Sequence, residues 1–139
     1  MSSAPRPPSR VNVTWREKHV FESGRPGGPT ATIDGEGVVG QSPPDAILSA
    51  LATCTSVDVV DILAKRRTPV QSLAVEVMGT RAEREPRRFT HIVLRFTVGG
   101  AGIAREDVEL AIRLSLEKYC SVRASLREDI AVDFEVVIA

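Results

Sequence analysis

One long helix with very little polar surface is the feature that most constrains this fold. It is predicted by residues 42–63, which read SPPDAILSALATCTSVDVVDIL. Ser42 is a good N-cap, Pro43 suits the first helical position, and Asp45 completes a capping-box pattern. We expect the helix to continue to about Arg67, where a Thr-Pro pair stops it.

The burial of this helix bears on the assembly of the protein. A helix that is apolar on every side is normally buried on every side, and one small sheet covers only one side. The simplest cover for the rest is a second copy of the chain. We therefore expect a homodimer with a substantial interface around residues 47–63. The alternative is that the other helix and the loops of the same chain suffice.

The rest of the chain predicts short strands and two further helices. Alternation of apolar with polar residues predicts strands, whereas apolar residues at helical spacing predict helices. The predicted strands cover 11–21, 30–34, 71–81, 89–98 and 130–138, and the predicted helices cover 105–119 and 121–127. Strands and helices do not alternate strictly, so we expect an α+β fold with mostly antiparallel sheets.

Length and composition indicate one ordinary globular domain. The chain has 139 residues, and its first ten are rich in Pro and Ser. We expect residues 1–10 to be a disordered tail and residues 11–139 to form a single domain. In the helix over 105–119 the expected buried face carries Val108, Ala111, Ile112, Ser115 and Tyr119.

Charge and hydropathy argue against several partners. The chain has 18 basic and 18 acidic residues, so a nucleic-acid partner, which needs a basic face, is not expected. No apolar run reaches about 18 residues without polar interruption, so no membrane partner is expected. The N-terminus has no apolar core of a secretory signal, which indicates a cytoplasmic protein. Thiols stay reduced there, and a disulfide would be transient and catalytic.

The sequence predicts no metal and no cofactor. His19 and His91 lie on separate predicted strands with no cysteine or acidic cluster at ligand spacing. Neither histidine has an evident partner in the sequence. We find no phosphate-binding loop, no dinucleotide fingerprint and no nucleophile elbow.

Two cysteines remain as candidates for chemistry. Cys54 lies within the long helix, and Cys120 lies in LEKYCSVRASL at the end of the second helix. One interpretation is structural, because free cysteine is often a small buried hydrophobe. The other is a redox pair, in which a peroxide-reducing cysteine must react as a thiolate with a pKa below about 8.5.

A redox role raises the question of what lowers the thiol pKa. Cys54 lies about three turns inside its helix, beyond the reach of the helix dipole. We therefore expect a cation from elsewhere, with Arg25 of the turn SGRPGG as the candidate and an exposed turn residue as the alternative. Asp45 either caps the helix or orients that arginine. It lies about 13.5 Å from Cys54 along the helix, so the two cannot meet within one helix.

The cysteine segments resemble those of a known family. Residues 42–63 are similar to the central-helix motif of the OsmC/Ohr family of osmotically induced and organic hydroperoxide resistance proteins. KYCSVRASL resembles the second cysteine motif of the family, and EREPRRFTHIVLRFTV resembles the strand pair of the OsmC-like subgroup. The resemblance covers about residues 11–138.

The resemblance implies a fold and a mechanism. Members are intertwined homodimers with a long buried central helix and sites at the interface. By motif position Cys54 corresponds to the peroxidatic cysteine and Cys120 to the resolving cysteine. The implied substrate is a small organic hydroperoxide, and the implied reductant is a small dithiol or a lipoylated protein. Asp45 stands where many relatives have glutamate, and the family arginine has no clear counterpart, so Arg25 rests on the residues alone. The alternative function is a non-enzymatic or weakly active thiol protein that binds an apolar ligand.

Overall fold

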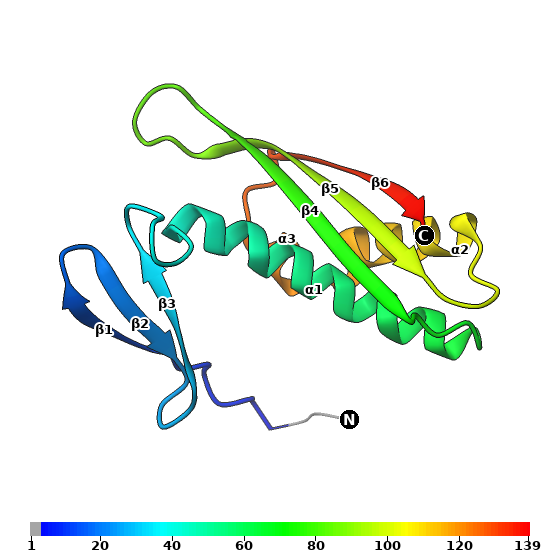
Figure 1. Ribbon diagram of the computed structural model, residues 1–139, viewed down its shortest axis with the longest axis horizontal. Coiled ribbons are helices and arrows are strands. Elements are labelled where there is room, and N and C mark those ends of the chain that lie inside the picture. Colours follow the sequence, from blue (N-terminus) through cyan, green and yellow to red (C-terminus); the bar gives the residue numbers. More distant parts are fainter. Residues whose placement is uncertain (1–3) are drawn as a thin grey trace. The chain divides into compact units, whose positions relative to one another are not determined.

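The computed structural model describes residues 4–139, which form a mixed α+β fold with two small sheets and several helices (Figure 1). The chain divides into two compact units, Met1–Ala46 and Ile47–Ala139. Of the predicted tail, residues 1–3 lie outside the described residues, and residues 4–10 are exposed and have no regular secondary structure. The prediction of a single domain stays a prediction.

The first unit contains an antiparallel sheet of three strands. These strands are β1 (Asn12–Glu17), β2 (Val20–Gly24) and β3 (Thr30–Asp34). The prediction of one strand over 11–21 was wrong, because the chain turns between Glu17 and Val20, where Lys18 has a positive φ of 47°. No Gly, Pro or Asn marks that turn in the sequence, so no residue type there signals a break in the strand.

The loop after β3 is organised by a buried carboxylate. Asp34 is only 3% exposed, and its side chain accepts hydrogen bonds from the backbone N–H groups of Glu36, Val38 and Val39. These hydrogen bonds, that of Glu36 first, lower the pKa of Asp34. Asp34 therefore fixes the path of the chain toward the long helix by satisfying the N–H groups of its own loop.

Helix α1 (Pro43–Lys65) begins as the sequence predicts. The Asp45 amide donates to the Ser42 hydroxyl at 3.2 Å, and the Ser42 amide donates to the Asp45 carboxylate at 3.3 Å. The capping box is therefore confirmed. Burial is less complete than expected, since the helix has five buried residues while Ile47, Val57 and Val60 are exposed in the single chain.

The length and hydropathy of α1 also match those of a membrane span. Its most apolar 18-residue window has a mean hydropathy of 1.7, and 28% of that window is buried. The run is not free of polar residues, as the sequence analysis stated, but isolated Ser, Thr and Asp residues lower its mean hydropathy only slightly. The core helix of a globular protein passes the same test, and one face of α1 does belong to the core.

The second unit contains the larger sheet, in the order β4 (Ser72–Arg81), β5 (Phe89–Gly99) and β6 (Ala131–Ile138). Strands β4 and β5 pair antiparallel, whereas β5 and β6 pair parallel. The alternation predicted for the central strand is confirmed. Its buried residues include Ile92, Leu94, Phe96 and Val98, which join residues of the helices in one apolar core.

The second predicted helix changes its geometry before Cys120. Helix α2 (Arg105–Leu114) is followed by one π-helical turn, η1 (Ser115–Tyr119), and by the short helix α3 (Ser121–Ser125). Val108, Ala111, Ile112 and Ser115 are buried as predicted, but Tyr119 is exposed. The π turn explains this difference, because its wider turn rotates residue 119 away from the face that a continuous α-helix would give it.

Candidate functional site

The structure brings the two cysteines together from distant parts of the second unit. Cys54 lies in the middle of α1 and is partly exposed, whereas Cys120 is the N-cap of α3 and is only 3% exposed. Both are free thiols. The two sulfur atoms therefore lie among the same few neighbours, which are Thr55 and the first residues of α3.

Side chains from one face of α1 meet the start of α3. The Cys54 sulfur lies 3.9 Å from the Ser121 hydroxyl, and the Thr55 hydroxyl lies 3.9 Å from the Cys120 sulfur. The backbone N–H of Arg123 donates to the Cys120 sulfur at 3.3 Å. Each sulfur therefore has a hydroxyl oxygen at 3.9 Å, and the Cys120 sulfur also accepts a backbone hydrogen bond.

The environment of Cys54 favours its thiolate. Burial is the largest influence and raises the pKa of the Cys54 thiol. It is opposed by the backbone N–H of Val122, by the Cys120 side chain, and by the hydroxyl and backbone N–H of Ser121. Together these groups hold the pKa of Cys54 below its ordinary value. The backbone donors belong to the first turn of α3, where N–H groups have no partner within the helix.

The environment of Cys120 favours its neutral thiol. Burial is again the largest influence, and the pKa of Cys120 is raised above its ordinary value. The Arg123 N–H and the Thr55 hydroxyl act in the opposite direction, while Cys54 raises the pKa of Cys120 through both a hydrogen bond and its charge. The site thus shifts the pKa values of its two thiols in opposite directions.

The pKa of Cys54 is lowered without a cation, contrary to the expectation from the sequence, because a second helix, α3, begins opposite the sulfur and its donors lower the pKa. The predicted cation, Arg25, lies on an exposed loop between β2 and β3, in the first unit, where its carbonyl accepts a hydrogen bond from the Gly28 amide at 2.9 Å. Its role toward Cys54 stays a prediction.

Asp45 has the structural role that the sequence predicts. Its carboxylate and amide bond to Ser42 at the start of α1, as described above. The functional alternative, in which Asp45 orients an arginine, stays a prediction.

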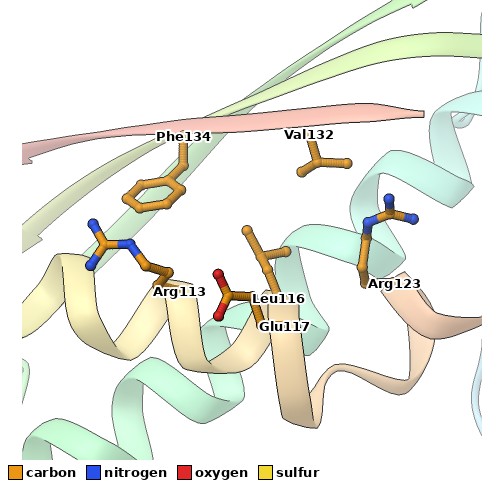
Figure 2. A pocket seen from close by; sticks show the side chains of 6 residues that line it. All are labelled: Arg113, Leu116, Glu117, Arg123, Val132 and Phe134. Atoms are coloured by element: carbon orange, nitrogen blue, oxygen red, sulfur yellow. The ribbon is translucent and has the colours of Figure 1, made fainter. Parts of the chain in front are cut away.

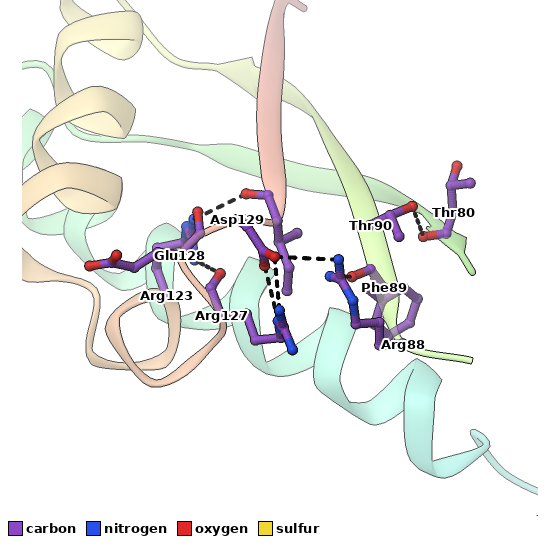
Figure 3. Close-up of polar contacts among 9 residues, drawn as sticks. Thr80, Arg88, Phe89, Thr90, Arg123, Arg127, Glu128 and Asp129 are labelled. Carbon is purple, nitrogen blue, oxygen red and sulfur yellow. Dashed lines mark hydrogen bonds and ion pairs between the residues drawn. The ribbon is translucent and has the colours of Figure 1, made fainter. Parts of the chain in front are cut away.

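A polar network anchors the loop that follows α3 (Figure 3). The Arg123 guanidinium donates to the carbonyls of Arg127, Glu128 and Ile130 at 3.1–3.3 Å. Asp129 accepts hydrogen bonds from Arg127 at 2.9 Å and from Arg88 at 3.4 Å. The chain between α3 and β6 is thereby tied to the start of β5, which fixes the short helix that faces Cys54.

A pocket of about 400 Å³ lies beside this helix (Figure 2). Its apolar wall is formed by Leu116, Val132 and Phe134, and its polar residues are Arg113, Glu117 and Arg123. The Arg113 guanidinium lies 5.8 Å from the centre of the Phe134 ring. Arg123 therefore contributes to both the pocket and the cysteine site. Its side chain lines the pocket, and its backbone N–H donates to the Cys120 sulfur.

Four contributors to the site were not foreseen from the sequence. Thr55, Ser121, Val122 and Arg123 act on the sulfur atoms through a hydroxyl or a backbone N–H. Thr55 and Ser121 are the residues directly after the two cysteines, and this adjacency is the only sequence signal that could have found them. A backbone donor such as Val122 leaves no signal, because every residue except proline carries an N–H group.

The histidines have partners that the sequence did not reveal. His91 Nε2 lies 2.7 Å from the Asp133 carboxylate, and His19 Nδ1 lies 3.5 Å from Glu36. The first pair exists because β6 lies parallel to β5, an arrangement that no local pattern encodes. Within residues 4–139 no group of three or more His, Cys, Asp or Glu side chains could hold a metal ion.

Comparison with known proteins gives the same family from sequence and from structure. The sequence model described as OsmC-like protein matches residues 34–135. The chain is 37% identical to Protein YhfA of Escherichia coli K12 over 133 residues, covering 94% of this chain and 99% of YhfA.

Solved structures share the fold. An OsmC-like protein from Mycoplasma pneumoniae superposes with a TM-score of 0.79 at 15% identity, covering 96% of this chain and 98% of that one. The organic hydroperoxide resistance protein OhrB of Bacillus subtilis superposes with a TM-score of 0.59 at 15% identity, covering 95% and 98%. The family match and the identity to YhfA decide the assignment: this chain belongs to the OsmC-like protein family.

Proposed function

We propose that this protein is a thiol-dependent peroxidase that reduces organic hydroperoxides through Cys54 and Cys120. The single observation that carries the proposal is the opposite effect of the site on its two thiols. The pKa of Cys54 is lowered and that of Cys120 is raised. A peroxidase of this type needs one cysteine ready to attack as a thiolate and a second that stays protonated until the first has been oxidised.

The chemistry follows from these two states. The Cys54 thiolate attacks one oxygen of the hydroperoxide, the O–O bond breaks, and the alkoxide takes up a proton to leave as an alcohol. Cys54 is then a sulfenic acid. The Cys120 sulfur attacks the Cys54 sulfur, an S–S bond forms, and the sulfenic hydroxyl leaves with the Cys120 proton as water. A dithiol returns the disulfide to two thiols.

The proposed substrate, reductant and compartment are those that the family suggests. OhrB, which shares the fold, is an organic hydroperoxide resistance protein by name. We propose a small organic hydroperoxide as substrate, a small dithiol or a lipoylated protein as reductant, and the cytoplasm as the compartment. Neither a metal nor a cofactor takes part in the proposed steps.

The test is a peroxide consumption assay combined with a pH titration of alkylation. Cumene hydroperoxide should be consumed with dihydrolipoamide, and glutathione and thioredoxin serve as the comparison reductants. Because the pKa of Cys54 is lowered and that of Cys120 is raised, iodoacetamide should modify Cys54 at a lower pH than free cysteine and Cys120 at a higher pH. A protein that alkylates first at Cys120, or consumes no peroxide with any of the three, would contradict the proposal.

We also propose that the protein is a homodimer with α1 at its centre. The support is the exposed apolar surface of α1, which includes Ile47, Val57 and Val60. A groove of about 350 Å³ along the same helix is lined by Ala52 and by residues of β4, among others. Ala50→Arg should break the dimer or the fold, since an unpaired charge in an apolar interface is costly. Sedimentation of the wild-type protein as a monomer at micromolar concentration would contradict the dimer.

The alternative function is binding of an apolar ligand without turnover. The observation that favours it is the pocket beside α3, whose wall is formed by Leu116, Val132 and Phe134. Fatty-acid binding that survives Cys54→Ser, together with absent peroxide consumption by the wild-type protein, would select this alternative. Binding that blocks alkylation of Cys54 would instead support the peroxidase.

A further inference from the structure

We infer that Asp58 and Ser115 form a positioning pair that holds the two cysteine segments in the geometry required for a Cys54–Cys120 disulfide. The inference deepens the proposed function and rests on it for its biological meaning. Its observations are independent of the pKa values: one short hydrogen bond, one backbone hydrogen bond and one π-helical turn that meet at Ser115.

Ser115 contacts both cysteine segments at once. Its hydroxyl donates to the Asp58 carboxylate at 2.6 Å, and its carbonyl accepts a hydrogen bond from the Cys120 amide at 2.7 Å. Asp58 lies four residues after Cys54, which is one helical turn along the same face of α1. A single residue therefore links the helix of Cys54 to the backbone of Cys120.

The hydrogen bond between Ser115 and Asp58 is short, and its donor is a buried hydroxyl. Ser115 is fully buried, so its hydroxyl would lose its partner altogether if Asp58 were removed. A hydrogen bond from a hydroxyl to a carboxylate at 2.6 Å has the length expected for a charge-assisted bond.

The π turn gives this link its effect on Cys120. In an α-helix the Cys120 amide would bond to the carbonyl of Leu116, but here it bonds to that of Ser115, five residues earlier. Cys120 then leaves the helix with an extended backbone, φ −74° and ψ 104°, and becomes the N-cap of α3. Its sulfur consequently lies beside Thr55, the neighbour of Cys54.

The consequence is a specific effect on disulfide formation. The S–S bond forms only when the two sulfur atoms approach in line, and small displacements of reacting groups cost large factors in effective concentration. Removal of either partner of the pair frees the Cys120 backbone from α1. We expect the equilibrium constant for the Cys54–Cys120 disulfide to fall by about tenfold, which corresponds to about 30 mV.

The experiment measures this constant without peroxide. The full-length protein is equilibrated in mixtures of reduced and oxidised glutathione, quenched in acid, and the disulfide fraction is determined by mass spectrometry. Asp58→Ala and Ser115→Ala should each lower the constant by about tenfold. Asp58→Asn keeps an acceptor oxygen for the hydroxyl and should restore most of it, which also protects the test against loss of folding in the alanine variants.

Asp107→Ala is the matched control. Asp107 of α2 accepts a hydrogen bond from Arg66, just beyond the end of α1, at 3.0 Å, so this variant breaks another link between the same two regions of the chain. It should leave the constant unchanged. An unchanged constant in both alanine variants, an equal drop in Asp107→Ala, or a wild-type protein that forms no disulfide overturns the inference. Absence of peroxide consumption with a normal constant overturns only the proposed function.

Discussion

The middle of α1 and the start of α3 each carry one cysteine, and these two environments shift the pKa of the thiol in opposite directions. For both Cys54 and Cys120 burial is the largest influence, and it raises both pKa values. The two differ in their hydrogen-bond donors. Cys54 faces the backbone N–H groups of another helix, whereas Cys120 caps that helix and has an ionisable neighbour that opposes its ionisation.

This difference shows how a cysteine deep within a helix can have a lowered thiol pKa. A position three turns inside a helix receives little from the dipole of that helix. The pKa of a cysteine there can still be lowered when a second helix begins opposite its side chain, because free N–H groups of a first turn stabilise a thiolate. The cysteine at the N-cap, nearer to those groups in sequence, is the more buried of the two, and its pKa is raised.

The largest expected effect comes from removing the Cys54 thiol. Cys54→Ser should lower the rate of peroxide consumption by about 10³-fold or more, as loss of a catalytic nucleophile does in other enzymes. The measurement is loss of cumene hydroperoxide with dihydrolipoamide in excess. If the Cys54→Ser protein keeps most of the rate, Cys120 rather than Cys54 is the cysteine that reacts first with peroxide.

Removing the Cys120 thiol should change the product of the reaction more than the rate of its first step. In Cys120→Ser the Cys54 sulfenic acid has no partner, so it should accumulate and oxidise further to sulfinic acid. Trapping with dimedone followed by mass spectrometry measures both species. If Cys120→Ser resists overoxidation as well as the wild-type protein does, Cys120 is not the resolving cysteine.

The role predicted for Arg25 is tested by the same alkylation profile. If Arg25 lies near the Cys54 sulfur in the assembled protein, Arg25→Ala should raise the pH at which Cys54 alkylates and slow peroxide reduction by about tenfold. Arg84→Ala, on the exposed turn between β4 and β5, is the control and should do neither. If the pH dependence of Cys54 alkylation is unchanged in Arg25→Ala, the hydrogen-bond donors of α3, rather than Arg25, lower the pKa of Cys54.

The smallest expected effect concerns one of those donors. Ser121→Ala removes the hydroxyl that lowers the pKa of Cys54 but keeps the backbone N–H groups. Alkylation of Cys54 below its pKa should slow by roughly two- to tenfold, the range for one hydrogen bond of about 0.5–1.5 kcal/mol. Ser121→Thr should restore the rate, and a Ser121→Ala profile identical to the wild-type profile would exclude the hydroxyl.

Several elements could be predicted from the sequence because their signals are local. The capping box of α1 needs only Ser42 and Asp45, and the buried face of β5 follows from alternation of Ile92, Leu94, Phe96 and Val98. The turn at Lys18 was missed because no residue there favours a positive φ. Tyr119 was misplaced because a π turn has no sequence signature.

The sequence was sufficient for the α+β class, for the long apolar helix and for the presence of one cysteine on each of two helical segments. Tertiary structure decided which of those thiols has the lowered pKa. The groups that lower it are the backbone N–H groups of Val122 and Ser121 together with the Cys120 and Ser121 side chains, and they act on Cys54 only because the chain folds back over 67 residues. Every residue except proline carries a backbone N–H group, so the direction of that group in space, rather than the identity of the residue, decides its effect.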